Sequence, residues 1–107
     1  MADKANKPLT GKQARFLRGL GHHLTPNIMI GREGIFDQLV ATTDEALSVH
    51  ELIKIKVQQN SPLDRREAAE ELAGRCKAQI AQILGNTFLL YRANKDKRPD
   101  KRIMLPG

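Results

Sequence analysis

The segment Leu-Ile-Lys-Ile-Lys-Val at residues 52–57 constrains the fold most, because its apolar and basic residues alternate. Successive side chains of a β-strand point to opposite faces of its sheet. A period of two therefore predicts a strand that turns two isoleucines and a valine toward a core. Lys54 and Lys56 fall on the other face, where they either meet a ligand or only protect a sheet edge from aggregation.

A shorter apolar stretch, Ile28 to Ile30, predicts a strand that leads into the turn Gly31-Arg32-Glu33-Gly34. An amphipathic pattern follows and predicts a helix from Ile35 to about Val49. Glycines allow positive φ angles and close approach of another backbone, and a helix N-terminus offers unpaired N–H groups to a phosphate. The alternative is that the glycines only make a tight connection.

The predicted helix 35–49 has two unlike sides. Its acidic outer side cannot lie against phosphates, so a nucleic acid would meet this helix at its N-terminal end, where the glycine turn is. The predicted inner arc consists of Ile35, Phe36, Leu39, Thr43, Ala46 and Leu47.

A basic helix is predicted near the N-terminus, beginning after Thr10 as its N-cap and fading near Gly21 to His23. Winding residues 12–24 at 3.6 residues per turn places Phe16, Leu20 and Leu24 on a core face, with Leu17 near it. The opposite face contains no acid, unlike an ordinary exposed helix surface, which favours a role in ligand binding. That basic face consists of Lys12, Arg15, Arg18 and His22.

The remaining elements are a helix and a hairpin. Ser61 is the predicted N-cap of the helix, with Asp64 in the capping-box position. Residues 79–84 and 87–92 are apolar stretches separated by Gly85-Asn86, which indicates a two-residue hairpin turn. The order helix, strand, helix, strand, helix, strand, strand predicts an α/β fold with a mixed sheet.

Positive charge is concentrated at the two ends of the chain. Of 107 residues, 18 are Lys or Arg and 12 are Asp or Glu, a net charge of +6. Residues 1–35 hold six bases and two acids, residues 36–91 six and eight, and residues 92–107 six and two. This distribution predicts one basic patch, in which both ends and the glycine turn share one side of the molecule and bind phosphate. Two solvated tails are the alternative.

Catalytic and metal sites are not expected. His22 and His23 are adjacent on a helix and point about 100° apart, which is poor geometry for joint ligation. Cys76, the single cysteine, is interpreted as a buried inert thiol, although a pairing with His50 stays open. No cofactor or small-molecule substrate is predicted. No apolar run is long enough to span a membrane and no signal peptide is apparent, so we expect a cytoplasmic protein.

Aromatic residues are few. By pattern, Phe16, Phe36 and Phe88 face the core, which leaves Tyr91 as the single candidate for stacking on a nucleobase. Proteins that read single-stranded bases generally use more aromatic residues. We therefore expect recognition of backbone and shape through Lys, Arg and loop N–H groups.

Several motifs together resemble one family. The basic helix, the strand followed by GREG, the segment HELIKIKV and the final LYR are similar to the CRM domain, named for chloroplast RNA splicing and ribosome maturation, and most of all to its stand-alone bacterial members. The resemblance implies a four-stranded mixed sheet with three helices, similar to the C-terminal domain of bacterial translation initiation factor three. It also implies RNA binding, with bacterial members associated with precursors of the large ribosomal subunit.

The resemblance also implies which residues bind RNA. They are the turn Gly31, Arg32, Glu33 and Gly34, the basic helix residues Lys12, Arg15 and Arg18, and Arg92 and Lys95 after the last strand. Glu33 departs from the family pattern toward acidity. It could stabilise the helix N-terminus, but it would repel a nearby phosphate.

The sequence thus predicts a non-catalytic, monomeric protein that binds structured RNA, namely ribosomal RNA or its precursor. A protein-interaction module that docks an acidic partner is the alternative, and a KH-type domain is disfavoured because GxxG follows a strand. The expected organisation is a flexible leader (1–8), the domain (9–98) and a basic and apolar tail (99–107). The candidate RNA-binding residues are Gly31, Arg32, Glu33, Gly34, Lys12, Arg15, Arg18, His22, Lys54, Lys56, Arg92 and Lys95.

Overall fold

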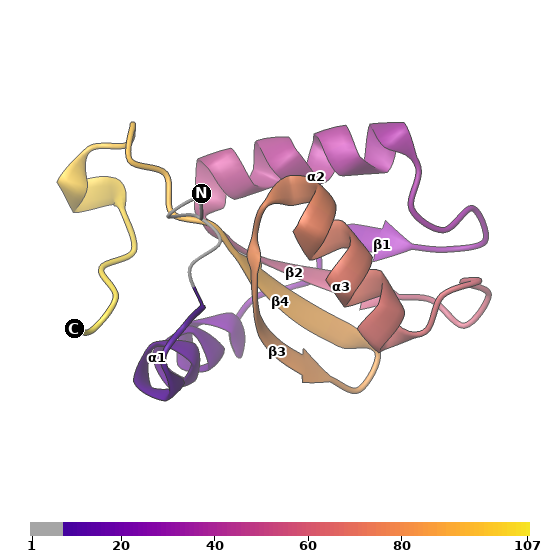
Figure 1. Ribbon diagram of the computed structural model, residues 1–107, viewed down its shortest axis with the longest axis horizontal. Helices are drawn as coiled ribbons and strands as arrows, with labels where there is room; N and C mark the ends of the chain where they lie inside the picture. The colour runs from indigo at the N-terminus through magenta and orange to yellow at the C-terminus, as the bar shows by residue number, and fades with distance from the viewer. Residues whose placement is uncertain (1–7) are drawn as a thin grey trace.

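The structure is a computed structural model that describes residues 8–107. The predicted leader lies outside the described residues, apart from Pro8. Three helices and four strands follow one another in the predicted order (Figure 1). They are α1 (Gly11–Gly21), β1 (Ile28–Ile30), α2 (Asp37–His50), β2 (Leu52–Val57), α3 (Arg65–Cys76), β3 (Gln79–Leu84) and β4 (Thr87–Tyr91), followed by the short 3-10 helix η2 (Pro99–Lys101).

The strands form one mixed sheet in the order β1-β2-β4-β3. β1 runs parallel to β2, whereas β4 is antiparallel to both β2 and β3. The two-residue turn between β3 and β4 contains Gly85, whose φ of +58° fits the predicted hairpin. The predicted α/β class and the four-stranded mixed sheet with three helices are therefore confirmed. The likeness to initiation factor three stays a prediction.

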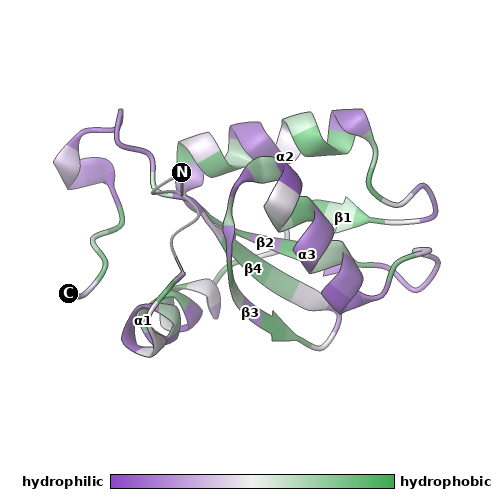
Figure 2. Cartoon of the chain, in the orientation of Figure 1, coloured by the Kyte–Doolittle hydropathy of each residue, from purple (hydrophilic) through white to green (hydrophobic). Residues whose placement is uncertain are grey.

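The sheet separates two apolar clusters, one on each face. The larger lies between the sheet and the helices α2 and α3, and it includes Ile53, Ile55 and Val57 of β2. The smaller lies under α1 and the C-terminal tail and includes Leu17, Leu89 and Tyr91. Figure 2 shows hydrophobic residues along much of the strands, hydrophilic and hydrophobic residues interspersed along the helices, and hydrophilic residues over much of the tail. The alternation predicted for residues 52–57 is confirmed, because Lys54 and Lys56 lie on the face opposite the larger cluster.

Helix α1 begins as predicted but presents another face to the core. Thr10 caps it, since Thr10 Oγ1 accepts from the Gln13 N–H and Gln13 Oε1 accepts from the Thr10 N–H, both at 3.1 Å. The predicted core face of Phe16, Leu20 and Leu24 is wrong, because these side chains are 40%, 41% and 36% exposed.

Leu17 and Gly21 are the buried residues of α1. A Cβ at Gly21 would lie 2.4 Å from Leu89 Cδ1, so the helix meets the sheet along a narrow line at these two positions. A narrow contact between helix and sheet buries only one line of helix residues. The prediction assumed a wider contact that would also bury the apolar residues beside that line.

Helix α3 starts three residues later than a Ser61 cap would imply. Asp64 is the N-cap, and it forms a reciprocal capping box with Glu67 through hydrogen bonds of 2.8 and 3.1 Å. Ser61 instead closes a tight turn, because its Oγ accepts from the Leu63 N–H at 3.1 Å. A carboxylate forms a stronger, charge-assisted bond to the helix N–H groups than a hydroxyl, which favours Asp64 as the cap.

The C-terminal tail folds back onto the domain. Ile103 and Leu105 pack against the smaller apolar cluster, and Gln13 Nε2 donates to the Pro106 carbonyl at 3.2 Å. The apolar part of the tail is therefore docked on the domain. Helix α1 and the tail therefore lie together at one end of the molecule (Figure 1).

Candidate nucleic-acid interface

The turn Gly31–Gly34 leaves β1 at the end of the molecule away from the tail (Figure 1). The Gly34 N–H donates to the Gly31 carbonyl at 2.9 Å, which closes a four-residue β-turn. Gly34 has φ +66°, and a Cβ there would lie 3.1 Å from Pro62 Cγ, so this position needs glycine. The predicted need for positive φ in the turn is met at Gly34.

Helix α2 begins only at Asp37, after Ile35 and Phe36, so the turn is not itself the helix start. The N-cap is Phe36, which forms no side-chain hydrogen bond to the helix N–H groups. Asp37 occupies the first turn and is 3.0 Å from the guanidinium of Arg75. Its carboxylate already offsets the partial positive charge of the helix N-terminus, which weakens this end as a phosphate site.

A hollow of about 350 Å³ opens beside the turn, lined by Gly31, Arg32, Glu33, Phe36 and Asn60. The ring of Phe36 is 40% exposed, so its predicted place in the core is wrong. The rest of the predicted inner arc is confirmed, because Leu39, Thr43 and Leu47 are buried and Ile35 and Ala46 pack against the larger cluster. An exposed aromatic ring therefore lies beside the turn, whereas the sequence pattern had placed this ring in the core.

The basic face of α1 is exposed to solvent, and it comprises Lys12, Arg15, Arg18 and the capping residue His22. Within residues 8–107 no ion pair involves these cations. Their charges are therefore available to an external anion.

A strip of the sheet beside α1 carries Met29, Lys54, Lys56 and Gln58, and we call it the sheet strip. Met29 of β1 is paired with Lys56 of β2, and both side chains are exposed. At one end Lys54 Nζ donates to the Leu24 carbonyl just after α1, at 3.4 Å. At the other end the Gln58 side chain lies beside Gly31 and donates to Met29 Sδ at 3.5 Å. The sheet strip therefore links the end of α1 to the glycine turn.

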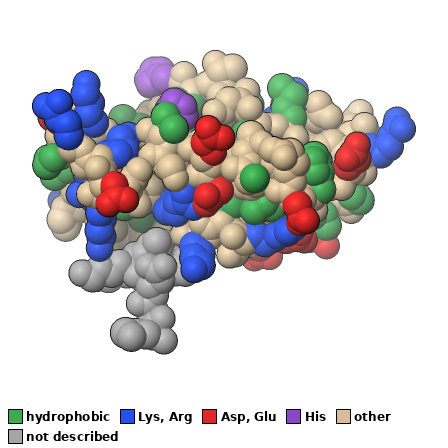
Figure 3. Space-filling view, turned by 90° about the horizontal axis from the view of Figure 1, so that it is seen from above, with side chains coloured by type: hydrophobic (Ala, Val, Ile, Leu, Met, Phe, Trp, Pro, Cys, Tyr) green, Lys and Arg blue, Asp and Glu red, His purple; other side chains and the backbone are tan. Residues whose placement is uncertain are grey.

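The sequence predicted one basic patch made by both chain ends and the glycine turn, and the shape of that predicted patch is wrong. Helix α1 and the tail meet, as expected, but the glycine turn lies at the opposite end of a molecule 39 Å long (Figure 1). Figure 3 shows Lys and Arg side chains gathered at the tail end, with acidic side chains spread over the middle of that view. The sheet strip, which carries Lys54 and Lys56, offers an anion a basic path between the two ends.

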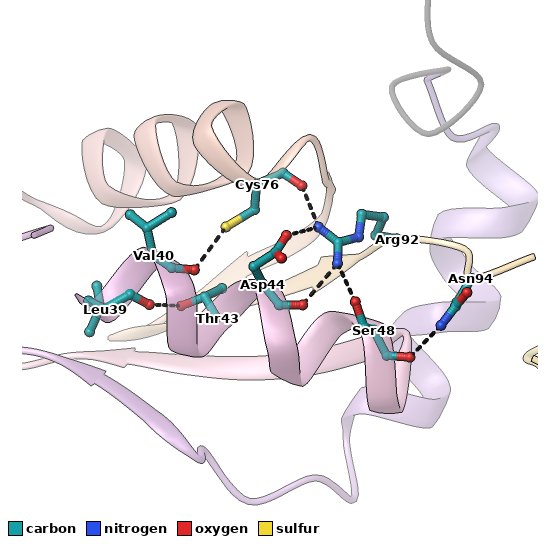
Figure 4. Close-up of polar contacts among 8 residues, drawn as sticks. All are labelled: Leu39, Val40, Thr43, Asp44, Ser48, Cys76, Arg92 and Asn94. Carbon is teal, nitrogen blue, oxygen red and sulfur yellow. Dashed lines mark hydrogen bonds and ion pairs between the residues drawn. The ribbon is translucent and has the colours of Figure 1, made fainter. Parts of the chain in front are cut away.

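Arg92 belongs to the fold and not to an open surface. Its guanidinium donates to the Asp44 carboxylate and carbonyl, to Ser48 Oγ and to the Cys76 carbonyl (Figure 4). The side chain is only 15% exposed. These contacts join the end of β4 to α2 and α3. Arg92 is therefore no longer a candidate RNA-binding residue. Lys95 is exposed and remains a candidate.

Glu51, a residue that sequence analysis did not single out, is fully buried between α2 and β2. Its carboxylate accepts from the backbone N–H groups of Asn94 and Ile103 at 2.8 and 2.7 Å, and Arg102 Nε lies 3.9 Å away. Glu51 also has φ +65°, which is rare outside glycine. One sequence signal could have identified Glu51. It is a charged residue placed directly between a predicted helix and a predicted strand with regular alternation.

The remaining reactive side chains are enclosed. Tyr91 is buried, so its prediction as a stacking residue is wrong, whereas Phe88 is in the core as predicted. Burial raises the pKa of the Tyr91 hydroxyl, and the Glu51 carboxylate raises it further. Cys76 is buried as predicted, and its Sγ lies 3.8 Å from the Val40 carbonyl. Among residues 8–107 no three His, Cys, Asp or Glu side chains are grouped to hold a metal, and no helix is long and apolar enough to cross a membrane.

Comparison with known proteins gives consistent matches. The model of the CRS1 / YhbY (CRM) domain family matches residues 9–92. The "Probable RNA-binding protein YqeI" of Bacillus subtilis is 44% identical over 98 residues, which cover 92% of this chain and 99% of the relative. The "Probable RNA-binding protein MJ0652" of Methanocaldococcus jannaschii is 33% identical over 111 residues, which cover 96% and 82%. The solution structure of the hypothetical protein SAV1595 from Staphylococcus aureus has a TM-score of 0.75 and 38% identity, and the match covers 92% and 99% of the two chains.

Proposed function

The chain belongs to the CRS1 / YhbY (CRM) domain family, and from this premise we propose that it is a non-catalytic RNA-binding protein. Two relatives that match most of its length carry the name "Probable RNA-binding protein". The observation that carries the proposal is the acid-free basic face of α1, which continues along the sheet strip toward the turn Gly31–Gly34. Lys and Arg side chains without protein partners bind phosphates and release counterions from RNA.

In this proposal the phosphate backbone of a structured RNA lies along the cations of α1 and the sheet strip. Its contacts are to Lys12, Arg15, Arg18, His22, Lys54 and Lys56, with Lys95 near the tail end. The backbone N–H groups and Arg32 of the glycine turn hold the far end of the RNA. The protein acts as a cytoplasmic monomer, and neither cofactor nor small-molecule substrate takes part.

Salt dependence tests RNA binding. The full chain is titrated into a labelled structured RNA at 50 to 300 mM salt, and log affinity is plotted against log salt concentration. Replacing Lys12, Arg15 and Arg18 together by Gln is expected to lower the slope by roughly 2 to 3, about 0.7–0.9 for each lost phosphate contact. Replacing Arg65, Arg66 and Lys77 by Gln removes the same charge from the α3 side and serves as the control. Equal effects of both triple variants would refute the assignment of the surface.

The RNA partner that we propose is ribosomal RNA or its precursor in assembly of the large subunit. Fractionation of cell extract by particle size, with RNase inhibited, tests this step. Co-migration of the protein with large-subunit precursors is the expected result. If the protein is found only in the free fractions while it still binds structured RNA in the titration, the ribosomal assignment fails and RNA binding stands.

A further inference from the structure

Phe36 is the N-cap residue of α2, but its side chain contributes little to the stability of this helix. An N-cap residue normally accepts a hydrogen bond from the first N–H groups of its helix, and a residue unable to do so costs about 1 kcal/mol. Phe36 has no acceptor, and its ring is 40% exposed, so the loss of a cap is not offset by full burial. A residue that breaks a local rule in this way points to a binding role at that position.

The ring stands at the wall of the hollow beside the glycine turn. Arg32, Glu33 and Asn60 also line the hollow, so its lining residues include a guanidinium, a carboxylate and an amide. An apolar ring with a few polar groups is the usual composition of a ligand site. An unpaired nucleobase matches it, because its faces stack on aromatic rings and its edges form hydrogen bonds.

The charge at this end of the molecule favours a base over a phosphate. Residues 31–37 contain one cation, Arg32, and two acids, Glu33 and Asp37. Asp37 is paired with Arg75, but Glu33 lines the hollow, and its carboxylate repels a phosphate there. A carboxylate oxygen instead accepts hydrogen bonds from the N–H groups of a base edge. Guanine presents two adjacent N–H donors on its Watson–Crick edge, more than any other base offers to one carboxylate.

We propose that the hollow beside Gly31–Gly34 binds one unpaired nucleobase, preferably guanine, stacked on Phe36 and hydrogen-bonded by Glu33 and Asn60. This proposal rests on the proposed RNA binding, in which phosphates lie on α1 and the sheet strip. The hollow distinguishes one base from another, whereas α1 and the sheet strip recognise the charge and shape of the RNA.

The test uses labelled RNA duplexes that differ in one bulged nucleotide, G, A, C or U, with a fully paired duplex as reference. The wild-type chain is expected to bind the bulged-G duplex most tightly. Phe36→Ala is expected to weaken that complex by roughly five- to 150-fold, the range for loss of one stacked base, and to leave the paired duplex unchanged. Phe36→Trp keeps a stacking surface and should retain the preference, whereas Phe36→Leu should not.

Two further variants complete the design. Phe16→Ala removes a ring of the same 40% exposure on α1, outside the hollow, and should leave the preference for the bulge intact. Glu33→Gln replaces one acceptor by a donor and should narrow the difference between G and the other bases. Circular dichroism of each variant checks that the fold is retained.

The outcomes separate the two proposals. If the wild type binds none of the RNAs at 50 mM salt, the proposed function itself fails. If it binds paired and bulged duplexes alike, or if Phe36→Ala and Phe16→Ala have the same effect, RNA binding stands and the nucleobase site is refuted.

Discussion

The carboxylate of Glu51 accepts a hydrogen bond at 2.7 Å from the backbone N–H of Ile103, 52 residues further along the chain. The other carboxylate oxygen accepts from the Asn94 N–H at 2.8 Å. One buried side chain thus satisfies two backbone donors that follow β4, at Asn94 and at Ile103 of the tail, and holds the tail over the smaller apolar cluster. This arrangement keeps the basic tail beside α1.

Loss of that carboxylate is expected to destabilise the whole domain. Glu51→Ala leaves two partly buried N–H groups without acceptors and Arg102 without its counter-charge, at a cost of about 2–5 kcal/mol in the free energy of unfolding. Urea unfolding followed by circular dichroism measures the change. Glu45→Ala, an exposed position on α2, is the control and should alter stability by at most about 0.5 kcal/mol. A cost below about 1 kcal/mol at Glu51 would contradict the assigned role.

Arg92→Lys is expected to destabilise the fold although it keeps the charge. The guanidinium reaches Asp44, Ser48 and the Cys76 carbonyl at once (Figure 4), and a lysine ammonium cannot reproduce that planar fork. The expected cost is about 1–3 kcal/mol of unfolding free energy, measured by thermal or urea unfolding. Arg66→Lys on the exposed side of α3 should be neutral. If Arg92→Lys is neutral but lowers RNA affinity, Arg92 belongs to the interface after all.

The strands were predictable because their signals are local. Alternation over residues 52–57 and the Gly85-Asn86 turn identified β2 and the β3–β4 hairpin, and Thr10 marked the start of α1. Each of these depends on neighbours a few residues away in sequence. The prediction was less accurate where two local signals competed, as at Ser61 and Asp64.

The burial of individual residues depended on contacts that no local pattern contains. Leu17 replaced Phe16 in the core because α1 meets the sheet along a narrow line at Gly21. Arg92 looked like a free cation, since its partner Asp44 is 48 residues away. The position of the glycine turn relative to the tail likewise follows from the sheet order, which composition and periodicity do not specify.

Substitution of two glycines by alanine should have opposite effects on stability. Gly34→Ala forces a Cβ onto a residue with φ +66° and brings it near Pro62, at an expected cost of about 1–2 kcal/mol. Gly74 lies within α3, and a Cβ there would meet open space, so Gly74→Ala should stabilise the protein by about 0.5–1 kcal/mol. Melting temperatures compare the two variants. If Gly34→Ala leaves the melting temperature unchanged or raises it, the turn geometry assigned to Gly34 is incorrect.

Cys76 should react slowly with alkylating reagents in the native state. Burial raises the pKa of its thiol, and the charge of Asp44 raises it further, so little thiolate exists at pH 8. Iodoacetamide labelling followed by mass spectrometry should therefore be slow in buffer and fast in 8 M urea. Because the folded-state pKa is the higher one, stability that depends on the neutral thiol is lost as pH rises above about 9. Rapid labelling of the native chain would show that the thiol is accessible.

Lys56 distinguishes an RNA that crosses the sheet strip from one that contacts only the basic chain ends. Its side chain is exposed between α1 and the glycine turn, and it faces away from the larger apolar cluster. If a phosphate lies over the strip, Lys56→Gln should lower the slope of log affinity against log salt by about 1 and leave stability unchanged. Lys95→Gln probes the tail end with the same loss of charge. An effect at Lys95 and none at Lys56 would confine the RNA to the chain ends and leave the glycine turn outside the interface.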